Sequence, residues 1–263
     1  MEYKFNPEEA FTVIKTDIQR FTEKVGTKKV VLGISGGKDS SVIARLASKI
    51  LGPENVYGVM MPNGVQKDIA DARQAIKEAG INSYAIDIAN AYNAVIDQLH
   101  LNGLRESADT KINLPPRLRT SILFAVAQTV GGIVLCSDNC TEAILGYSTF
   151  GGDGFGCYAP LKGLTVTEVI ALGDWLGVSE NLCHKVPSDG LQDKSDEDRL
   201  GMKYADVDNF IRKNEGTDEL KAKVLERYLK NKFKSDIIDV PYPELGLPNF
   251  VTDMYINDDD MPF

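Results

Sequence analysis

Apolar side chains recur at intervals of three and four residues along the first part of the chain. Ile14, Ile18 and Phe21 follow this spacing, which is that of one face of an α-helix. Asn6 stands before a proline and two glutamates, a combination that is typical of a helix start. We therefore expect an amphipathic helix that begins after Asn6 and ends near Val25.

Further along, short apolar runs have the length of buried strands, and amphipathic stretches separate them. Strands are expected at residues 30–34, 55–61, 83–88 and 132–136, and helices up to residue 51 and at residues 66–79, 90–103, 117–130, 165–177, 205–213 and 217–233. Strands that alternate with helices of this length build parallel sheets. The pattern predicts an α/β fold, a doubly wound parallel sheet with helices on both faces and a C-terminal helical annex.

A chain of 263 residues with 43% apolar content is long enough to bury a complete core. We expect a single domain, with its core at about residues 26–190 and with C-terminal helices and a tail at about residues 191–263. The tail contains several prolines and ends in an acidic run. We expect it to be mobile or to clasp another subunit.

The chain carries a net charge of −9 and has a pI of about 4.9, so a nucleic acid would bind against a repulsive field. No apolar stretch reaches the length of about 18 residues that a membrane helix needs. The N-terminus lacks the apolar core of a signal peptide. We expect a soluble, cytoplasmic protein with no nucleic-acid or membrane partner. The four cysteines form no C-x-x-C pair, which favours reduced thiols over disulfides or a structural zinc site.

The most informative segment lies between the first expected strand and the helix that follows it. Its residues are Gly33, Ile34, Ser35, Gly36, Gly37, Lys38, Asp39 and Ser40. Glycines allow the backbone N–H groups to approach and wrap a polyphosphate at the helix N-terminus, and the serines add hydroxyl donors. Asp39 is of the type that holds the accompanying magnesium. The segment predicts an ATP-binding loop.

Two common phosphate loops do not fit this segment. A Walker A loop needs glycine at position 32 and serine or threonine at position 39, where this chain has leucine and aspartate. The dinucleotide motif G-x-G-x-x-G fails because position 35 is serine. What remains, S-G-G-x-D-S, resembles the pyrophosphate loop of the ATP pyrophosphatase superfamily, whose members split ATP between the α and β phosphates.

Five further segments, in order along the chain, resemble motifs of the ammonia-dependent NAD synthetase family. They are M-P-N-G at residues 61–64, N-L-P-P-R-L-R at residues 113–119, S-D-N-C-T-E at residues 137–142, G-Y-S-T-F-G-G-D at residues 146–153, and Pro187-Ser188 with S-D-E at residues 195–197. Each segment alone is a weak signal. Together, at suitable spacing, they identify the chain as similar to this family over about two thirds of its length.

The resemblance implies a reaction in two steps. The carboxylate of nicotinic acid adenine dinucleotide (deamido-NAD) attacks the α-phosphate of ATP, which gives an acyl-adenylate and pyrophosphate. Ammonia then displaces AMP and leaves the amide of NAD. The resemblance also implies Mg²⁺, and a homodimer with the acceptor site at its interface.

The same resemblance assigns roles to individual residues. It gives Asp39 and Glu142 as magnesium ligands, Ser137, Ser188 and the loop from Gly33 to Ser40 as ATP contacts, Arg117, Arg119 and Asp153 as contacts of the acceptor, and Lys38, Asp39 and Asp153 as catalytic residues. The residues alone also allow other roles. Asp39 can cap a helix, Glu142 and Arg119 can lie on solvated helix faces, and Asp153 can order a turn.

The chain departs from the family pattern at several positions. A lysine that the family uses for ATP phosphate aligns with Val166, and we expect Lys162 or Lys38 to supply this charge instead. Phe150 and Cys157 replace polar residues near the acceptor. Adenylation by ATP is therefore more firmly indicated than the identity of the acid. Three alternatives stay open: a related ligase that adenylates a different carboxylate, a tRNA-modifying enzyme of the superfamily, and a non-catalytic nucleotide-binding module.

Overall fold

The computed structural model describes residues 3–64, 68–185, 196–237 and 240–254. Its sheet has four parallel strands in the order β3-β2-β1-β4. The strands are β1 (Val30–Gly33), β2 (Val56–Met60), β3 (Asn82–Ala85) and β4 (Ile133–Val134). All four were expected near these positions. β4 is shorter than its apolar run, although the Leu135 N–H still donates to Val31 O of β1 at 2.9 Å, and Leu135 also bridges in parallel to Tyr158.

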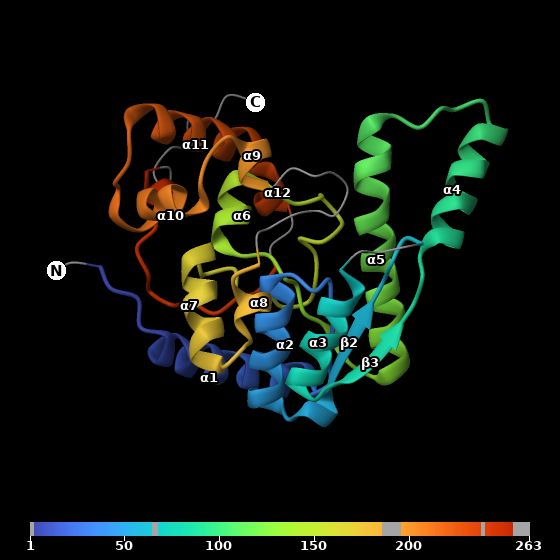
Figure 1. Cartoon of the computed structure of the whole chain (residues 1–263), viewed down its shortest axis with the longest axis horizontal. Helices are drawn as coiled ribbons and strands as arrows, with labels where there is room; N and C mark the ends of the chain where they lie inside the picture. The colour runs from blue at the N-terminus through green and yellow to red at the C-terminus, as the bar shows by residue number, and fades with distance from the viewer. Residues whose placement is uncertain (1–2, 65–67, 186–195, 238–239, 255–263) are drawn as a thin grey trace.

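Helices surround this sheet (Figure 1). They are α1 (Pro7–Val25), α2 (Lys38–Leu51), α3 (Ile69–Ala79), α4 (Ala89–Leu101), α5 (Ala108–Val130), α6 (Cys140–Leu145), α7 (Val166–Leu176), α8 (Glu180–Cys183), α9 (Asp196–Leu200), α10 (Tyr204–Lys213), α11 (Asp218–Asn231), α12 (Phe233–Ile237) and α13 (Phe250–Asp253). A short 3-10 turn, Pro53–Asn55, precedes β2.

The two faces of the sheet bury different groups of helices, because successive side chains of a strand point to opposite sides. Val30 and Leu32 of β1 pack in one apolar cluster with α1, α2, α3 and α7. Val31, between them, packs in another cluster that includes Leu123 and Ala127 of α5. The prediction of an α/β fold with a doubly wound parallel sheet is confirmed.

A separate apolar cluster forms the C-terminal helical annex. Its buried residues come mainly from α6, α10, α11 and α13, and Phe210 and Val224 are fully buried in it. Residues 240–254 of the expected tail pack against the body of the molecule. The Ala159 N–H donates to Pro241 O at 2.8 Å, and Leu245 packs against the main core, so this segment is anchored by hydrogen bonds and apolar contacts. Residues 255–263 lie outside the described part of the chain.

Helix α5 begins at Ala108, well before the expected start at residue 117. Ser107 and Thr110 form a capping box that starts the helix, and the helix then runs through Pro115 and Pro116. Proline removes a helical hydrogen bond and usually ends a helix. Here the helix continues because its later turns pack against β1 and β4.

Helices α4 and α5 form a hairpin whose far end projects from the body of the molecule (Figure 1). None of the α4 residues is buried in this chain. No helix within the described residues is both long enough and apolar enough to cross a membrane.

Candidate active site at the switch point of the sheet

The site lies at the point of the sheet where the strand order reverses, on either side of β1. β1 has β2 on one side and β4 on the other, so the loops that follow β1 and β4 leave the sheet beside each other. Ligands of open α/β sheets bind at such points. Ile34 fixes the first of these loops, since its side chain is buried and its N–H donates to Val59 O at 2.9 Å.

The loop after β1 has the backbone of a phosphate-binding turn. Gly36 has φ +83°, and a Cβ there would lie 2.7 Å from the Ala72 nitrogen at the start of α3, so only glycine fits. Gly37 opens α2 without a side-chain cap. The hydroxyls of Ser40 and Ser41 donate back to Gly37 O at 3.1 and 2.8 Å, which holds the turn in place. The first N–H groups of α2 are thus positioned to bind an anion.

Lys38 is a buried cation within this loop. Its side chain is only 5% exposed, and its ammonium lies 3.1 Å from Asp39 Oδ2 and 5.6 Å from the centre of the Tyr204 ring. Burial alone would lower the pKa of Lys38, but the charges of Asp39 and Glu142 outweigh burial and raise it. Lys38 therefore stays protonated and presents positive charge at the phosphate loop.

Asn139, in the loop after β4, joins the two expected magnesium ligands. Its amide donates to Asp39 Oδ1 at 2.9 Å, and its side-chain oxygen accepts from the Glu142 N–H at 3.0 Å. Glu142 in turn accepts from the Asn139 N–H, so the two residues form the capping box that starts α6. Asn139 was not among the residues expected at the site, although the N-x-x-E spacing is a recognisable cap signal in the sequence.

The surroundings of Glu142 favour a cation. Burial and, next, the charge of Asp39 raise the pKa of Glu142 well above its usual value. Two carboxylates held close in a half-buried site repel each other until a positive charge is shared between them. Carboxylate oxygens on two loops at one sheet edge are ligands that suit Mg²⁺. Asp39 and Glu142 therefore fit a magnesium ion.

A small cavity lies beside these residues. It has a volume of about 30 Å³, and Asp138, Ser148, Phe150, Lys162 and Lys234 are among its lining residues. Burial, followed by the charge of Asp153, raises the pKa of Asp138 to about 7, and the nearby Lys162 opposes this shift. Of the two lysines expected to supply charge, Lys162 therefore lies near Asp138, whereas Lys38 contacts Asp39.

Three residues were expected to bind the acceptor. In this structure they form hydrogen bonds to loop backbone. Arg117 Nε donates to Phe150 O at 3.2 Å, and Arg119 Nε donates to Met61 O at 3.0 Å. Asp153 accepts from the Thr149 N–H at 2.7 Å, which is the turn-ordering role that its residue type allows. The bonds of Arg117 and Asp153 hold the segment at residues 146–153, and the bond of Arg119 holds its side chain against the end of β2.

The remaining expected residues are less informative. Ser137 follows the buried Cys136 at the carboxyl end of β4. Ser188 lies outside the described residues. Val166 is buried in the same apolar cluster as Tyr204, over whose ring the Lys38 ammonium lies. Lys38 therefore brings its charge to the neighbourhood in which the family lysine was expected.

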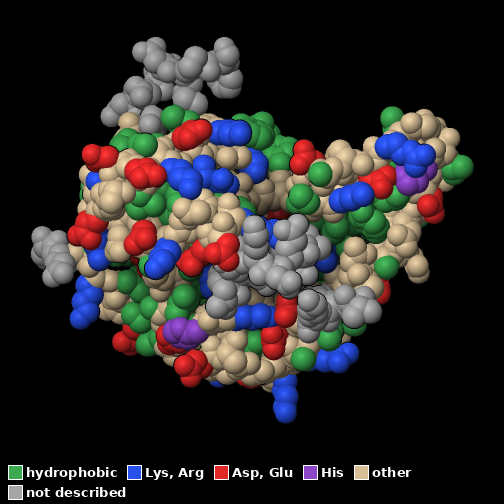
Figure 2. Space-filling model, turned by 45° about the horizontal axis from the view of Figure 1, so that its top comes forward, with side chains coloured by type: hydrophobic (Ala, Val, Ile, Leu, Met, Phe, Trp, Pro, Cys, Tyr) green, Lys and Arg blue, Asp and Glu red, His purple; other side chains and the backbone are tan. Residues whose placement is uncertain are grey.

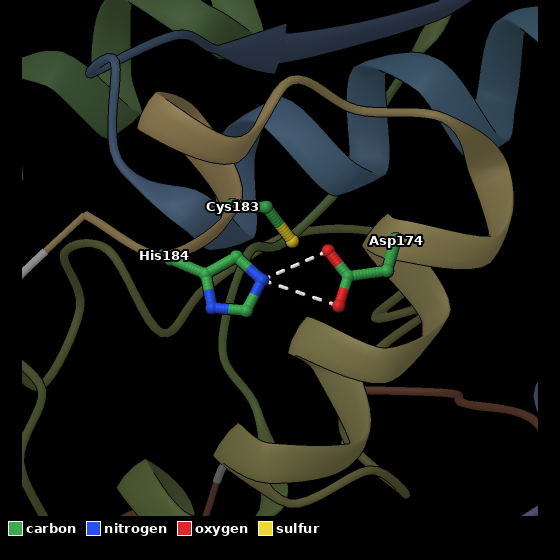
Figure 3. Close-up of side chains that lie close together, drawn as sticks. All are labelled: Asp174, Cys183 and His184. Carbon is green, nitrogen blue, oxygen red and sulfur yellow. Dashed lines mark hydrogen bonds and ion pairs between the residues drawn. The ribbon is translucent and has the colours of Figure 1, made fainter.

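A second group of ligand-type side chains lies where α7 meets α8 (Figure 3). His184 Nε2 lies 2.9 Å from Asp174 Oδ1, and the Cys183 thiol donates to Ile170 O at 3.3 Å. Burial and the charge of Asp174 raise the pKa of Cys183 to about 12, so its thiol stays protonated. Because all three groups have partners within the protein, we assign them a structural role in joining the two helices.

Comparisons with known proteins agree with this architecture. The NAD synthase family model matches residues 10–238. The ammonia-dependent NAD⁺ synthetase of Pyrococcus horikoshii is 38% identical over 195 residues, which cover 74% of this chain and 75% of that protein. The enzyme of the same description from Mannheimia succiniciproducens is 40% identical over 197 residues, covering 73% and 78% of the two chains.

Solved structures give the same assignment. The NMN synthetase of Francisella tularensis superimposes with a TM-score of 0.82 and 30% identity, covering 90% of this chain and 99% of that one. The NAD⁺ synthetase of Burkholderia pseudomallei gives a TM-score of 0.74 and 28% identity, covering 89% and 92%. The resemblance seen in the sequence motifs is confirmed, and with it the prediction of a ligase. This chain belongs to the NAD synthase family.

Proposed function

We propose that this protein uses ATP and ammonia to convert deamido-NAD to NAD, with release of pyrophosphate and AMP. The observation that carries the proposal is the single hydrogen-bonded unit formed by Asp39, Asn139 and Glu142 beside the phosphate loop. Lys38 adds a buried positive charge to this unit. The ammonia-dependent relatives named above support the choice of reaction.

The chain's own residues supply alignment and charge. The pyridine carboxylate of the acceptor forms a bond to the α-phosphorus of ATP while the bond to the bridging oxygen breaks. The N–H groups at the start of α2 and the Lys38 ammonium bind the departing pyrophosphate and neutralise its charge. Asp39 and Glu142 would hold Mg²⁺, which when bound neutralises phosphate charge at this place.

The second step needs little from side chains. Ammonia attacks the acyl carbon of the adenylate, a proton leaves the nitrogen, and AMP departs with the carboxylate oxygen that had attacked phosphorus. We assign Arg117 to a phosphate of the acceptor, because a planar guanidinium matches phosphate geometry and Arg117 is exposed. Arg119 and Asp153 support it by fixing the surrounding loops.

The direct test is incubation of the protein with deamido-NAD, ATP, Mg²⁺ and ammonium. Equal amounts of NAD, AMP and pyrophosphate are the expected products. Release of ADP and phosphate would overturn the proposal, and so would the absence of AMP with every nicotinate nucleotide tried. The Asp39→Asn variant should lose pyrophosphate release, whereas Asp97→Asn, on the exposed surface of α4, should retain it.

A second candidate acceptor is the mononucleotide. The NMN synthetase structure resembles this chain more closely, by TM-score, than the NAD⁺ synthetase structure from Burkholderia does. The acid that yields NMN by the same chemistry is nicotinic acid mononucleotide. Measuring kcat/KM for both acids in competition decides between them: a ratio above about 10 in favour of either acid corresponds to a difference of about 1.4 kcal/mol in transition-state binding.

We also propose a homodimer. The α4–α5 hairpin stands off from the body, with a hollow between them (Figure 2). Leu101, Leu104 and Ile112, near its tip, are 77%, 57% and 55% exposed. Such apolar side chains on a projecting element favour burial against a second subunit. Light scattering should give twice the monomer mass, and Leu101→Asp with Ile112→Asp should lower it.

The compartment that we propose is the cytoplasm. All four cysteines are free thiols in this structure, as is usual for proteins of a reducing compartment. Fractionation of cells that produce the protein should recover it with cytoplasmic markers. Recovery with an oxidising compartment would contradict this placement.

A further inference from the structure

Tyr204 carries the buried side-chain polar atom that lacks a partner within the described residues. The residue is 3% exposed, and its hydroxyl makes no hydrogen bond in that part of the chain. Leaving a hydroxyl buried and unpaired is costly, and almost all buried polar groups in folded proteins are paired. The hydroxyl of Tyr204 therefore points to a partner other than the described residues, and a bound ligand is the candidate that its surroundings favour.

The backbone around Tyr204 holds this side chain in place. Tyr204 is the first residue of α10, and its N–H donates to Glu197 Oε1 at 2.8 Å. Its ring packs in the apolar cluster of the annex together with the buried residues Val166 and Val207. The ring thus lies between the annex and the phosphate loop. Its packing there limits the positions that the hydroxyl can reach.

The surroundings of the Tyr204 hydroxyl belong to the ATP site. The Lys38 ammonium lies 5.6 Å from the ring centre. Burial and then the charges of Glu142 and Asp196 raise the pKa of Tyr204 above its usual value, so the phenol is neutral and remains a hydrogen-bond donor. The two carboxylates nearby, Asp39 of the phosphate loop and Glu142 of α6, already have donors, because Asp39 accepts from Asn139 and pairs with Lys38, and Glu142 accepts from the Asn139 N–H.

We propose that Tyr204 is a substrate-contacting residue that donates its hydroxyl to an anionic oxygen of bound magnesium–ATP. The proposal rests on the proposed function of the site. A neutral donor can contact a phosphate oxygen between Lys38 and the magnesium ligands without adding charge to a site that already holds several ions. In the ligand-free protein the same hydroxyl destabilises the fold, because it is buried without a partner among the residues that the structure describes.

These two properties make the proposal testable with one substitution. Tyr204→Phe removes the hydroxyl and keeps the ring in its apolar cluster. We expect the ligand-free variant to have an unchanged or higher melting temperature. We expect its affinity for magnesium with α,β-methylene ATP, measured by calorimetry, to fall by about 10- to 150-fold, which is the range for a lost hydrogen bond to a charged group.

Tyr158→Phe is the matched control. Tyr158 is also buried, but its hydroxyl donates to Asp17 Oδ2 at 2.8 Å. This variant should show the opposite pattern, with a lower melting temperature and unchanged affinity for the nucleotide. The contrast between the two variants separates a hydroxyl that binds ligand from one that binds protein.

Two results would overturn the inference about Tyr204 alone. One is a Tyr204→Phe protein that binds the nucleotide as tightly as the wild type. The other is a ligand-free Tyr204→Phe protein that loses stability as Tyr158→Phe does, since this would mean that the hydroxyl has a partner in the chain. If the wild type itself fails to bind the nucleotide, the proposed function fails as well.

Discussion

The side-chain amide of Asn139 donates a 2.9 Å hydrogen bond to the carboxylate of Asp39, one hundred positions earlier in the chain. The same side chain caps α6 and so fixes Glu142. One residue therefore sets the separation of the two carboxylates that fit magnesium. This relationship makes the loops after β1 and β4 a single site.

Replacing Asn139 should affect both stability and activity. In Asn139→Ala, loss of the helix cap should lower the free energy of unfolding by about 0.5–2 kcal/mol. Because Asp39 also loses its donor, pyrophosphate release should fall at least tenfold, corresponding to about 1.4 kcal/mol. Asn6→Ala is the control, since Asn6 caps α1 in the same way. It should lower stability to a similar extent and keep full activity; equal activity in both variants would contradict the role given to Asn139.

Gly36 should be the least replaceable glycine of the phosphate loop. Gly36→Ala adds a Cβ at φ +83° and 2.7 Å from a backbone nitrogen of α3. Gly80 also has a positive φ, but a Cβ there meets nothing within 4 Å. Gly80→Ala should therefore lower the free energy of unfolding only by the strain of a left-handed backbone, about 1–2 kcal/mol. Gly36→Ala should lower it by about 1–3 kcal/mol more, because the new Cβ also clashes. Equal losses in urea unfolding would mean that the loop can shift away from α3.

The buried ion pair between Arg212 and Glu168 should be costly to break from one side. Arg212 donates to both carboxylate oxygens, at 2.7 and 2.8 Å, and both side chains are 4% exposed. Arg212→Ala leaves Glu168 buried without its partner and should lower the free energy of unfolding by about 3–5 kcal/mol. The double change Arg212→Met with Glu168→Leu should cost less than the single change. A larger loss in the double variant would contradict this account of the pair.

Asp138 should make the stability of the metal-free protein depend on pH. Its pKa is raised to about 7 by burial and by Asp153, with Asp39 adding to the shift and Lys162 and Ser148 opposing it. Between roughly pH 4, the usual pKa of aspartate, and pH 7, the folded protein retains a proton that the unfolded chain has lost. The free energy of unfolding therefore falls as pH rises through this window.

Asp138→Asn should remove this contribution. In buffer with EDTA, the melting temperature of the variant relative to the wild type should increase from pH 5 to pH 8. Asp97→Asn, at an exposed position, should show no such trend. A difference between Asp138→Asn and wild type that stays constant over this range would show that Asp138 titrates normally.

Local patterns predicted most of the fold. The apolar runs located the four strands, and the helix of residues 7–25 begins and ends where its cap signals stand. The start of α5 was missed because Pro115 and Pro116 normally end helices, whereas packing against the sheet carries this helix through them. The packing of the described part of the tail could not be predicted, because the bond that anchors it, from the Ala159 N–H to Pro241 O, joins distant segments.

The candidate site could be predicted in part. The loop from Gly33 to Ser40 follows from residue types and spacing, since its geometry is local. The link from Asn139 to Asp39 depends on β1 and β4 being neighbours, which no short window of sequence contains. The same is true of the partners of Arg117 and Arg119, which are backbone carbonyls that any residue could present.

The central claim is that the acceptor carboxylate attacks the α-phosphate of ATP at this site. Deamido-NAD labelled with ¹⁸O in its pyridine carboxylate tests it most directly, with ATP, Mg²⁺ and ammonium present and the products analysed by mass spectrometry. The account predicts one labelled oxygen in each AMP and none in pyrophosphate. Unlabelled AMP, or label in inorganic phosphate, would contradict it.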